Sequence, residues 1–279
     1  MSRQDSLSIF DSAETKAKLS ESYGKVIENI EKSTISALLK NTELSGDPHS
    51  GSVEARRIAN TDSQEYGTAR KGGKGQAVTA PPVTVVIDTD RELINEVEEK
   101  DLALSGVDGL IAKKTASNER SMKRELERAF FSAAATAGSA ATLTKTEANE
   151  KLEELIQLVE TVKNDYVDGV ERDLINVICT PKAYGEIRNF LDKGAHNANI
   201  DTAVGEFGMF HSVNVFSSVY LPEGVEMIAM CRGAVAQPVL TSLDEPGKIQ
   251  MSDAYHFGMF YYYGTKAVMP DLIFKVATA

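Results

Sequence analysis

Apolar residues recur every three or four positions between residues 11 and 40, which predicts an amphipathic helix. Asp11 and Glu14 have the spacing of a capping box at its start. The stripe consists of Leu19, Tyr23, Val26, Ile27, Ile30, Leu38 and Leu39. A cluster of turn-forming residues at 45–52 ends the pattern, so we expect a helical arm followed by a different kind of segment.

Residues 46–80 form the least core-like part of the chain. Only four of these 35 residues are large and apolar, namely Val53, Ile58, Tyr66 and Val78. The pattern predicts a ribbon of two extended arms, 53–59 and 66–70, which leaves through a basic, glycine-rich stretch at 71–75. An isolated two-stranded ribbon is marginally stable in water, so we expect this one to become ordered against another surface.

The pattern becomes globular from residue 81. A β-branched run predicts a strand over 83–87, and Thr89 with Glu92 suggests a capping box for a short helix containing Leu93, Ile94 and Val97. A longer helix is predicted from about Ser117 into the alanine-rich stretch 132–141.

Thr144 and Glu147 have the spacing of another capping box. The apolar residues that follow step by four and three positions and predict one buried helical stripe: Ala148, Leu152, Leu155, Val159, Val162 and Tyr166. Residues 174–179 then read as a strand, and Thr180 with Pro181 starts a helix that Gly194 can end.

Five further apolar runs predict strands, at 213–220, 225–231, 234–240, 257–263 and 266–276. The fold class predicted from the order of elements is α+β, and no internal repeat is found.

Composition and charge narrow the function. The chain has 279 residues, 42% of them hydrophobic, with a formal charge of −11, and its sequence pI is about 5.0. This composition excludes wholesale disorder, and a negative chain cannot hold nucleic acid through its overall charge. Cys179 and Cys231 lie in apolar runs, which fits small core residues in a reducing compartment. No secretion signal and no apolar run of membrane-spanning length are found.

No motif predicts chemistry, so we expect no enzyme, no cofactor and no metal site. The four histidines lie far apart in the sequence without metal-ligand spacing: His49, His196, His211 and His256. Residues 67–74 only partly match a phosphate-binding loop, because Gly75 replaces the Ser or Thr and no apolar strand precedes them.

Charge is distributed unevenly. Residues 54–76 carry a net charge of +2, and residues 88–101 carry −5. This fits a ribbon of one subunit lying over the acidic segment of a neighbour, although two unrelated solvated faces explain the charges equally well. The predicted contact residues on the ribbon are Arg56, Arg57, Tyr66, Arg70, Lys71 and Lys74. The predicted acidic counterpart is Glu92, Glu96, Glu98 and Glu99.

The long helix carries a third patch with a net charge of +3 over residues 113–128. Its basic face is predicted to contain Arg120, Lys123, Arg124 and Arg128. Such a face fits either nucleic acid or solvent.

The order of these parts resembles the major capsid (head) proteins of tailed bacteriophages, which have the Hong Kong 97-type capsid fold. The resemblance covers nearly the whole chain. Its most specific parts are the ribbon at 51–75 with its basic glycine-rich exit and the runs 175–184 and 226–235.

The resemblance implies four regions: an N-terminal arm (1–47), an extended β-hairpin loop (48–82), a peripheral domain with a long spine helix (83–144 and 237–256) and an axial domain (145–236 and 257–279). It also implies a structural function, in which hexamers and pentamers form an icosahedral shell that encloses double-stranded DNA without sequence-specific binding. The expected location is the virion, after assembly in the cytoplasm of the host bacterium.

Some relatives join this loop to a neighbour through a covalent lysine bond, and Lys71 and Lys74 lie in the matching region. The short arm suggests an uncleaved N-terminus and a separate scaffolding protein, besides a portal and a decoration protein. Two alternatives stay open: an encapsulin-type shell that holds cargo enzymes, and a nucleic-acid-binding module that uses the basic ribbon.

Overall fold

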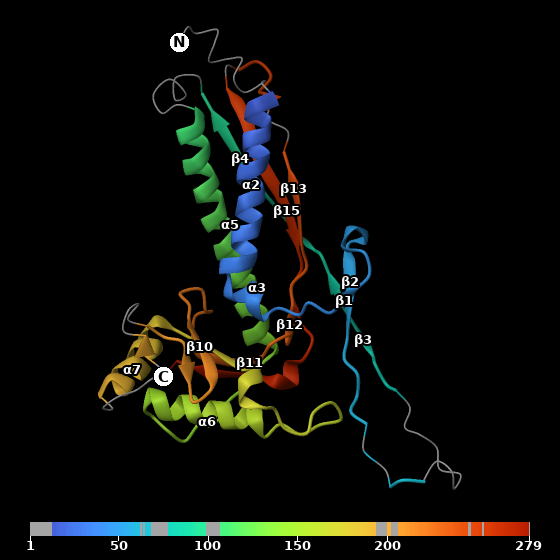
Figure 1. The fold of residues 1–279 in the computed structure, drawn as a ribbon, viewed down its shortest axis with the longest axis vertical. Coiled ribbons are helices and arrows are strands. Elements are labelled where there is room, and N and C mark those ends of the chain that lie inside the picture. Colours follow the sequence, from blue (N-terminus) through green and yellow to red (C-terminus); the bar gives the residue numbers. More distant parts are fainter. Residues whose placement is uncertain are drawn as a thin grey trace.

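The computed structural model describes residues 13–61, 63, 65–67, 78–98, 107–193, 200–201, 206–244, 247–252 and 254–278. Figure 1 shows a tall layer of two helices against a sheet, standing on a second α+β body. A three-stranded sheet lies beside their junction, and an extended segment leaves it below. The mixed helix and sheet content confirms the α+β class.

The arm is helical, as the sequence predicts. Helix α2 (Ala13–Ser33) is followed by the short helix α3 (Ile35–Leu39). The chain turns between them at Thr34, whose hydroxyl donates to the Ile30 carbonyl and accepts from the Ala37 amide. The predicted stripe is largely buried in α2: Leu19, Tyr23, Val26 and Ile30. Asp11, the expected cap, lies outside the described residues.

The tall layer packs α2 and the spine helix α5 (Val107–Ala137) against one face of a sheet. Its long strand β15 (Tyr255–Tyr263) pairs with β13 (Val239–Leu243) and β14 (Gly247–Lys248) on one side and with β4 on the other. Met122 and Leu126 of α5 are buried against Phe257 and Tyr261 of β15. Residues 257–263, which the domain prediction placed in the axial domain, therefore pair within this upper sheet.

The predicted short helix at Thr89 is wrong, because residues 89–97 form strand β4 (Thr89–Val97). The strand pairs antiparallel with β15 along its whole length. Leu93, Asn95 and Val97 alternate toward the core with exposed residues between them. This two-residue period is present in the sequence, but the Thr89 and Glu92 spacing of a capping box competes with it.

The extended loop is also built differently from the predicted ribbon. Strand β2 (Ser52–Arg56) pairs with β1 (Leu44–Ser45) and with β3 (Pro82–Val86). The expected pairing of 53–59 with 66–70 is therefore wrong at its first arm, and the two arms of the loop are the segments after β2 and before β3. The turn Pro48–Ser50 leads into β2.

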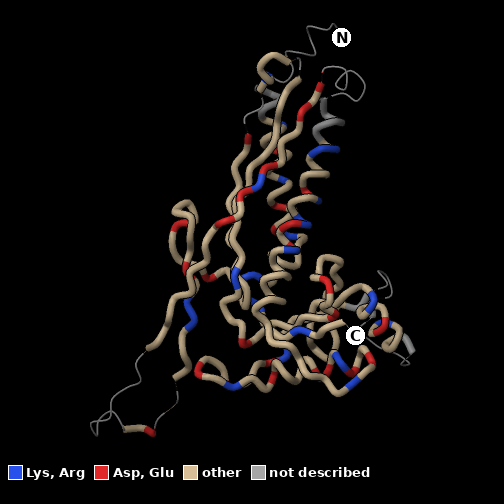
Figure 2. The backbone as a smooth tube through the Cα atoms, turned by 180° about the vertical axis from the view of Figure 1, so that it is seen from behind, with Lys and Arg blue, Asp and Glu red and all other residues tan. Residues whose placement is uncertain are grey.

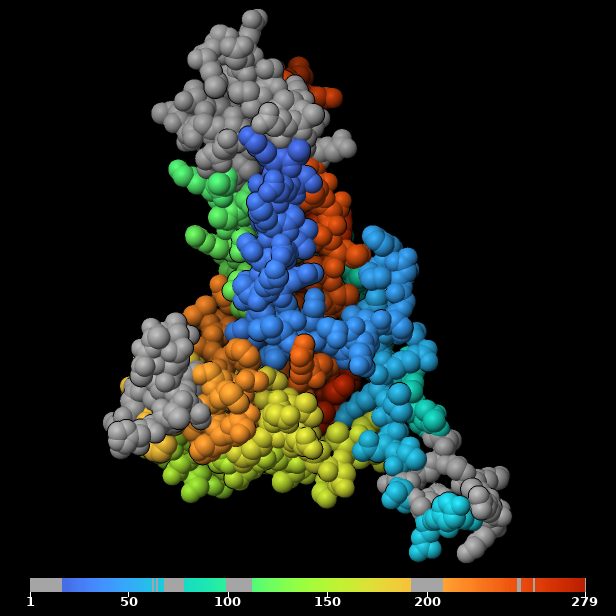
Figure 3. All heavy atoms as spheres, viewed as in Figure 1, coloured from blue at the N-terminus to red at the C-terminus, as the bar shows by residue number. Residues whose placement is uncertain are grey.

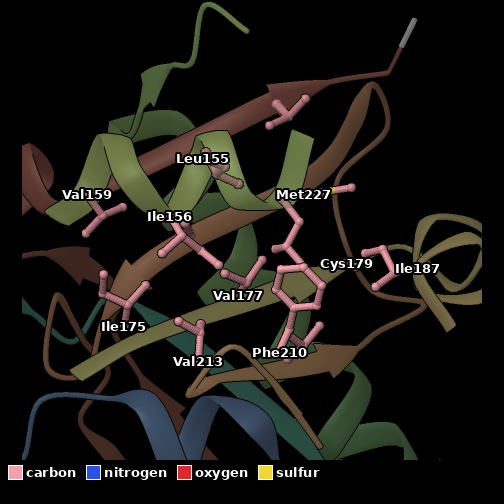
Figure 4. Close-up of a cluster of buried hydrophobic side chains, with 14 of the residues drawn as sticks. Leu155, Ile156, Val159, Ile175, Val177, Cys179, Ile187, Phe210, Val213 and Met227 are labelled. Carbon is pink, nitrogen blue, oxygen red and sulfur yellow. The ribbon is translucent and has the colours of Figure 1, made fainter. Parts of the chain in front are cut away.

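The lower body contains a six-stranded sheet in the order β5-β17-β11-β6-β10-β9. Its strands are β5 (Ser139–Ala140), β17 (Ile273–Ala277), β11 (Val225–Cys231), β6 (Ile175–Cys179), β10 (Val213–Ser217) and β9 (Met209–Phe210). Helices α6 (Ala148–Glu160) and α7 (Pro181–Lys193) cover one face. Figure 4 shows the core between these helices and the sheet, including Leu155, Val177 and Met227.

The other face of this sheet packs against the end of α5. Phe130 and Phe131 are fully buried and share a cluster with Ile178, Ile228 and Ile273. Both faces of the sheet are buried at β6, because successive side chains of a strand point to opposite faces. Val177 points to α6, and Ile178 points to α5. The spine helix therefore contributes to both the upper core and the lower core.

Some helix ends differ from the sequence prediction. Helix α5 begins ten residues before Ser117. Helix α6 begins at Ala148, and Thr144 instead donates from its amide and its hydroxyl to Glu154. It ends at Glu160, so Val162 and Tyr166 lie in the loop that follows. Thr180 caps α7 through the Ala183 amide, as expected.

Several strands are shorter than their apolar runs. The predicted strand 234–240 divides into β12 (Val235–Ala236) and β13 on either side of Gln237 and Pro238. The predicted strand 266–276 divides into β16 (Lys266–Ala267) and β17, with the turn Pro270–Leu272 between them. The remaining elements are the turn Arg172–Leu174 and the pair β7 (Ile200–Asp201) and β8 (Glu206–Phe207).

Candidate assembly surfaces

The extended loop is fixed to the lower body by Arg57, just after β2. Its guanidinium donates two hydrogen bonds to the Asp271 carboxylate, at 2.6 and 2.9 Å. It also lies over the Tyr166 ring, 4.4 Å from the centroid. The Arg57 side chain is only 13% exposed. These contacts lie within one chain, so Arg57 anchors the loop rather than presenting a free charge to a neighbour.

Beyond this anchor the loop leaves the body. The Asn60 amide donates to the Asp165 carbonyl, and the Ala59 amide donates to the Thr79 carbonyl at 2.9 Å, which brings the two arms together. Ile58 is 65% exposed, Val78 79% and Tyr66 90%. Figure 3 shows the loop projecting away from the body below the three-stranded sheet. Three large apolar side chains on one projecting segment favour burial against another molecule.

The other predicted loop residues have different positions. Arg56 is exposed and lies 3.3 Å from Glu54 of the same strand. Arg70, Lys71 and Lys74 lie outside the described residues.

The predicted acidic counterpart lies on the outer face of the upper sheet, which faces away from α2 and α5. Asp90, Glu92 and Glu96 are exposed and alternate along β4, opposite Tyr262, Phe260 and His256 of β15. Ile94 is 43% exposed on the same face. Glu98 is exposed just beyond the strand, and Glu99 lies outside the described residues. The face thus combines carboxylates with partly exposed aromatic rings, and aromatic residues are enriched in protein interfaces.

The residues of the predicted basic face of the spine helix do not all point the same way. Arg120, Arg124 and Arg128 are exposed. Lys123 instead turns toward α2, where its ammonium donates to the Ser33 carbonyl at 3.0 Å. Ser33 is the last residue of α2, so its carbonyl has no partner within the helix, and Lys123 supplies one.

All three glutamates in the predicted patch on α5 have hydrogen-bond partners elsewhere in the chain. Glu119 accepts from Asn29 of α2, and Glu125 accepts from the Tyr261 hydroxyl at 2.5 Å. Glu127 is 2% exposed and accepts from the Ile35 amide at 2.9 Å, which caps α3. Burial raises the pKa of Glu127 against the opposing effects of this hydrogen bond and of Lys123.

Sequence reasoning missed the partners of the loop anchor. Asp271 and Tyr166 lie far from Arg57 in the sequence, and Asn164 also donates to Asp271. No spacing rule connects such residues, because only the tertiary fold brings the loop after α6 to the turn before β17.

Cys179 and Cys231 are buried in the lower sheet, as expected, and burial raises the pKa of both thiols. Among the described residues, no cluster of acidic, histidine or cysteine side chains has the geometry to hold a metal ion. None of the described helices is both long and apolar enough to span a membrane.

Comparison by sequence finds no matching family model and no matching curated protein. Comparison of the fold does find similar solved structures. The capsid of Cyanophage P-SCSP1u superposes with a TM-score of 0.64 and 12% identity over 88% of both chains. The capsid of Ralstonia phage GP4 superposes with a TM-score of 0.60 and 10% identity over 82% of this chain and 83% of that chain.

This chain has the tailed-phage capsid fold. A virus-like particle from Pyrococcus furiosus shares it, with a TM-score of 0.58 and 14% identity over 92% of this chain and 98% of that chain. At these identities the likeness establishes the fold and leaves function to the surfaces described above.

Proposed function

We propose that this chain is a major capsid protein, which assembles with copies of itself as hexamers and pentamers into an icosahedral shell around double-stranded DNA. The observation that carries the proposal is the anchored loop: its base is fixed by Arg57, while Ile58, Tyr66 and Val78 project with little cover from their own chain. Repeated weak contacts of this kind give a closed shell high collective stability.

The neighbour's surface that suits the loop is the outer face of the upper sheet. The loop sequence adds Arg70, Lys71 and Lys74, and the sheet face presents Asp90, Glu92 and Glu96 beside Phe260 and Tyr262. Opposite charges would fix the register, and the apolar side chains on both surfaces would be removed from water. A scaffolding protein, a portal and a decoration protein complete the proposed set of partners.

Charge reversal tests this interface. Arg70→Glu, Lys71→Glu and Lys74→Glu together should abolish particle formation, because they place like charges opposite Glu92 and Glu96. Glu92→Lys with Glu96→Lys should also block assembly alone and should restore it when combined with the loop changes. Sedimentation measures assembly, and urea unfolding of the unassembled protein confirms an intact subunit. Normal particles from either single set, or no rescue by the combination, contradicts the contact.

Arg57 is left out of these variants on purpose. Its side chain binds Asp271 in its own subunit, so replacing it would weaken the loop's base as well as any interface. Arg56 is also left out because it already lies beside Glu54.

The second candidate is an encapsulin-type shell that holds cargo enzymes. The likeness to the Pyrococcus furiosus particle over nearly all of both chains favours it. Particle contents separate the two: packaged DNA supports the phage shell, and a co-purifying enzyme supports the cargo shell. A stable monomer that binds DNA with strong salt dependence would instead support a nucleic-acid-binding module.

A further inference from the structure

The exposed face of the spine helix carries a basic stripe, which we define as Lys113, Arg120, Arg124 and Arg128. The helical period places them on the side opposite Met122 and Leu126, which are buried against α2 and the sheet. The three arginines follow one another at four-residue steps, about 6 Å apart along the helix axis. Figure 2 shows basic segments recurring along α5.

Among the described residues, no ion pair neutralises the stripe. Arg120 and Arg124 are without an ion-pair or hydrogen-bond partner among the described residues, and Arg128 lies over the Tyr220 ring, 5.9 Å from the centroid. Like charges four residues apart destabilise a helix by about 0.2–0.5 kcal/mol for each pair. The neighbouring helix α2 shows the opposite arrangement, because Lys25 and Lys32 each pair with a glutamate one turn away.

The surroundings of the stripe favour a polyelectrolyte over a protein partner. Protein interfaces centre on buried aromatic or aliphatic anchors. The described side chains of α5 include none of the large apolar residues that are exposed elsewhere in the molecule. Ser117 and Ala116 are the small exposed neighbours of the arginines. A regular row of cations without apolar anchors suits the evenly charged backbone of duplex DNA, which it can contact without reading its sequence.

We propose that the basic stripe of α5 contacts the phosphate backbone of the enclosed DNA, so that α2 and α5 face the interior of the shell and the outer face of the upper sheet points outward. This inference rests on the proposed function, since it assumes a closed shell around DNA. Charge supports the orientation, because Asp90, Glu92 and Glu96 on the opposite face would repel phosphate.

Cysteine labelling of assembled particles tests the orientation. Cys179 and Cys231 are buried and give little background. Ser117→Cys places a thiol beside the stripe. A maleimide on a polyethylene glycol too bulky to cross a closed shell should label this thiol only after dissociation, whereas a small maleimide that can enter the shell should label it in intact particles. Labelling by the bulky reagent in intact particles overturns the orientation, whereas a failure of the unmodified protein to form particles overturns the proposed function.

Ultraviolet crosslinking of DNA-filled particles tests the contact itself. Peptides from α5 should carry DNA adducts in the unmodified protein, and Arg120→Gln with Arg124→Gln should lose most of them. Lys25→Gln with Lys32→Gln removes the same charge from the same layer and should keep them, because those lysines are already paired. Unchanged adducts in the arginine variant, or crosslinks from α5 to a scaffolding protein in place of DNA, overturn the DNA contact.

Discussion

Arg57 shows how one residue connects distant parts of the chain. It follows the last residue of β2, binds Asp271 in the turn before β17 and lies over Tyr166 in the loop after α6. A bidentate arginine–carboxylate pair fixes direction as well as distance, and stacking on Tyr166 restricts the guanidinium further. The direction in which the loop leaves the body therefore depends on this side chain.

Arg57→Ala should lower the free energy of unfolding of the unassembled protein by about 1.5–3 kcal/mol, because Asp271 loses a charged partner in a partly buried site. Arg56→Ala is the matched control. Its side chain is exposed and its pairing with Glu54 is loose, so the expected change stays within about 0.5 kcal/mol. Urea unfolding measures both. Equal losses for the two variants would show that Arg57 is not an anchor.

A second charged cluster joins α6 to the start of β6. Arg172 binds Glu153 and Glu160, each at 2.6 Å, and His211 lies 3.0 Å from Glu153. The hydrogen bond from Arg172 lowers the pKa of Glu153 to about 2, with burial opposing and the hydrogen bond to His211 assisting. Because the pKa is lower in the folded state, the ionised carboxylate stabilises the fold above the ordinary value near 4.5 and loses this effect as pH falls toward 2.

Glu153→Gln should therefore lower the free energy of unfolding by about 1–2 kcal/mol at pH 7. The difference from the unmodified protein should shrink steadily as the pH falls from about 4.5 to about 2. Denaturant unfolding across this range measures it, and Glu150→Gln on the same helix should change stability by less than about 0.5 kcal/mol. A difference that is constant with pH would mean that the pair does not stabilise the fold electrostatically.

At the scale of elements, the strand β4 is where local signals and tertiary structure disagree. The capping-box spacing of Thr89 and Glu92 favours a helix, but all nine residues of β4 pair with β15 at the edge of the upper core. Gly258 allows this close pairing. A Cβ atom there would lie 2.4 Å from the Leu93 carbonyl oxygen and 2.9 Å from the Ile94 Cα atom.

Gly258→Ala should destabilise the unassembled protein by about 1–3 kcal/mol, because the β4 backbone must move to admit the methyl group. Gly24→Ala in α2 is the control in the same layer, since nothing lies within 4 Å of its added Cβ. Replacing a helical glycine by alanine should stabilise the protein by about 0.5–1 kcal/mol. Thermal unfolding compares the two, and an unchanged midpoint for Gly258→Ala would contradict the observed β4–β15 pairing.

Elements with a strong apolar period could be predicted from the sequence, and elements defined by pairing could not. Helix α2, strand β6 and the capped helix α7 match their patterns because each buries a continuous stripe or run. Strand β4 and the pairing of β2 with β3 differ because a partner more than 20 residues away decides them. Helix α5 starts earlier than predicted: Val107, Leu110 and Ile111 have helical spacing, but Gly109 and the polar run at 113–115 interrupt the apolar pattern.

The charge of each candidate surface could be predicted from the sequence, but the direction in which the surface faces could not. The sequence places acidic residues near Glu92 and basic residues near Arg120, but only the fold shows that they lie on opposite faces of one layer. It also shows that Lys123 and Arg57 are used within the subunit. Side chains with similar composition therefore serve different roles according to the element face that carries them.

At the scale of the whole molecule, each subunit has a body of two packed cores and a loop that it does not cover. The spine helix links the cores through Leu126 above and Phe131 below, which makes the body a stable unit for repeated contacts. In the proposed assembly, the loop of one copy lies over the outer sheet face of another, and repeated contacts of this kind would stabilise a closed shell.

Electron microscopy of the purified protein, alone and with the proteins encoded beside it, can decide whether it forms a shell. We expect closed shells or rings of five and six subunits, in which the loop of one subunit lies over the upper sheet of the next. A protein that stays monomeric under all conditions, although it is folded by circular dichroism, would contradict assembly as its function.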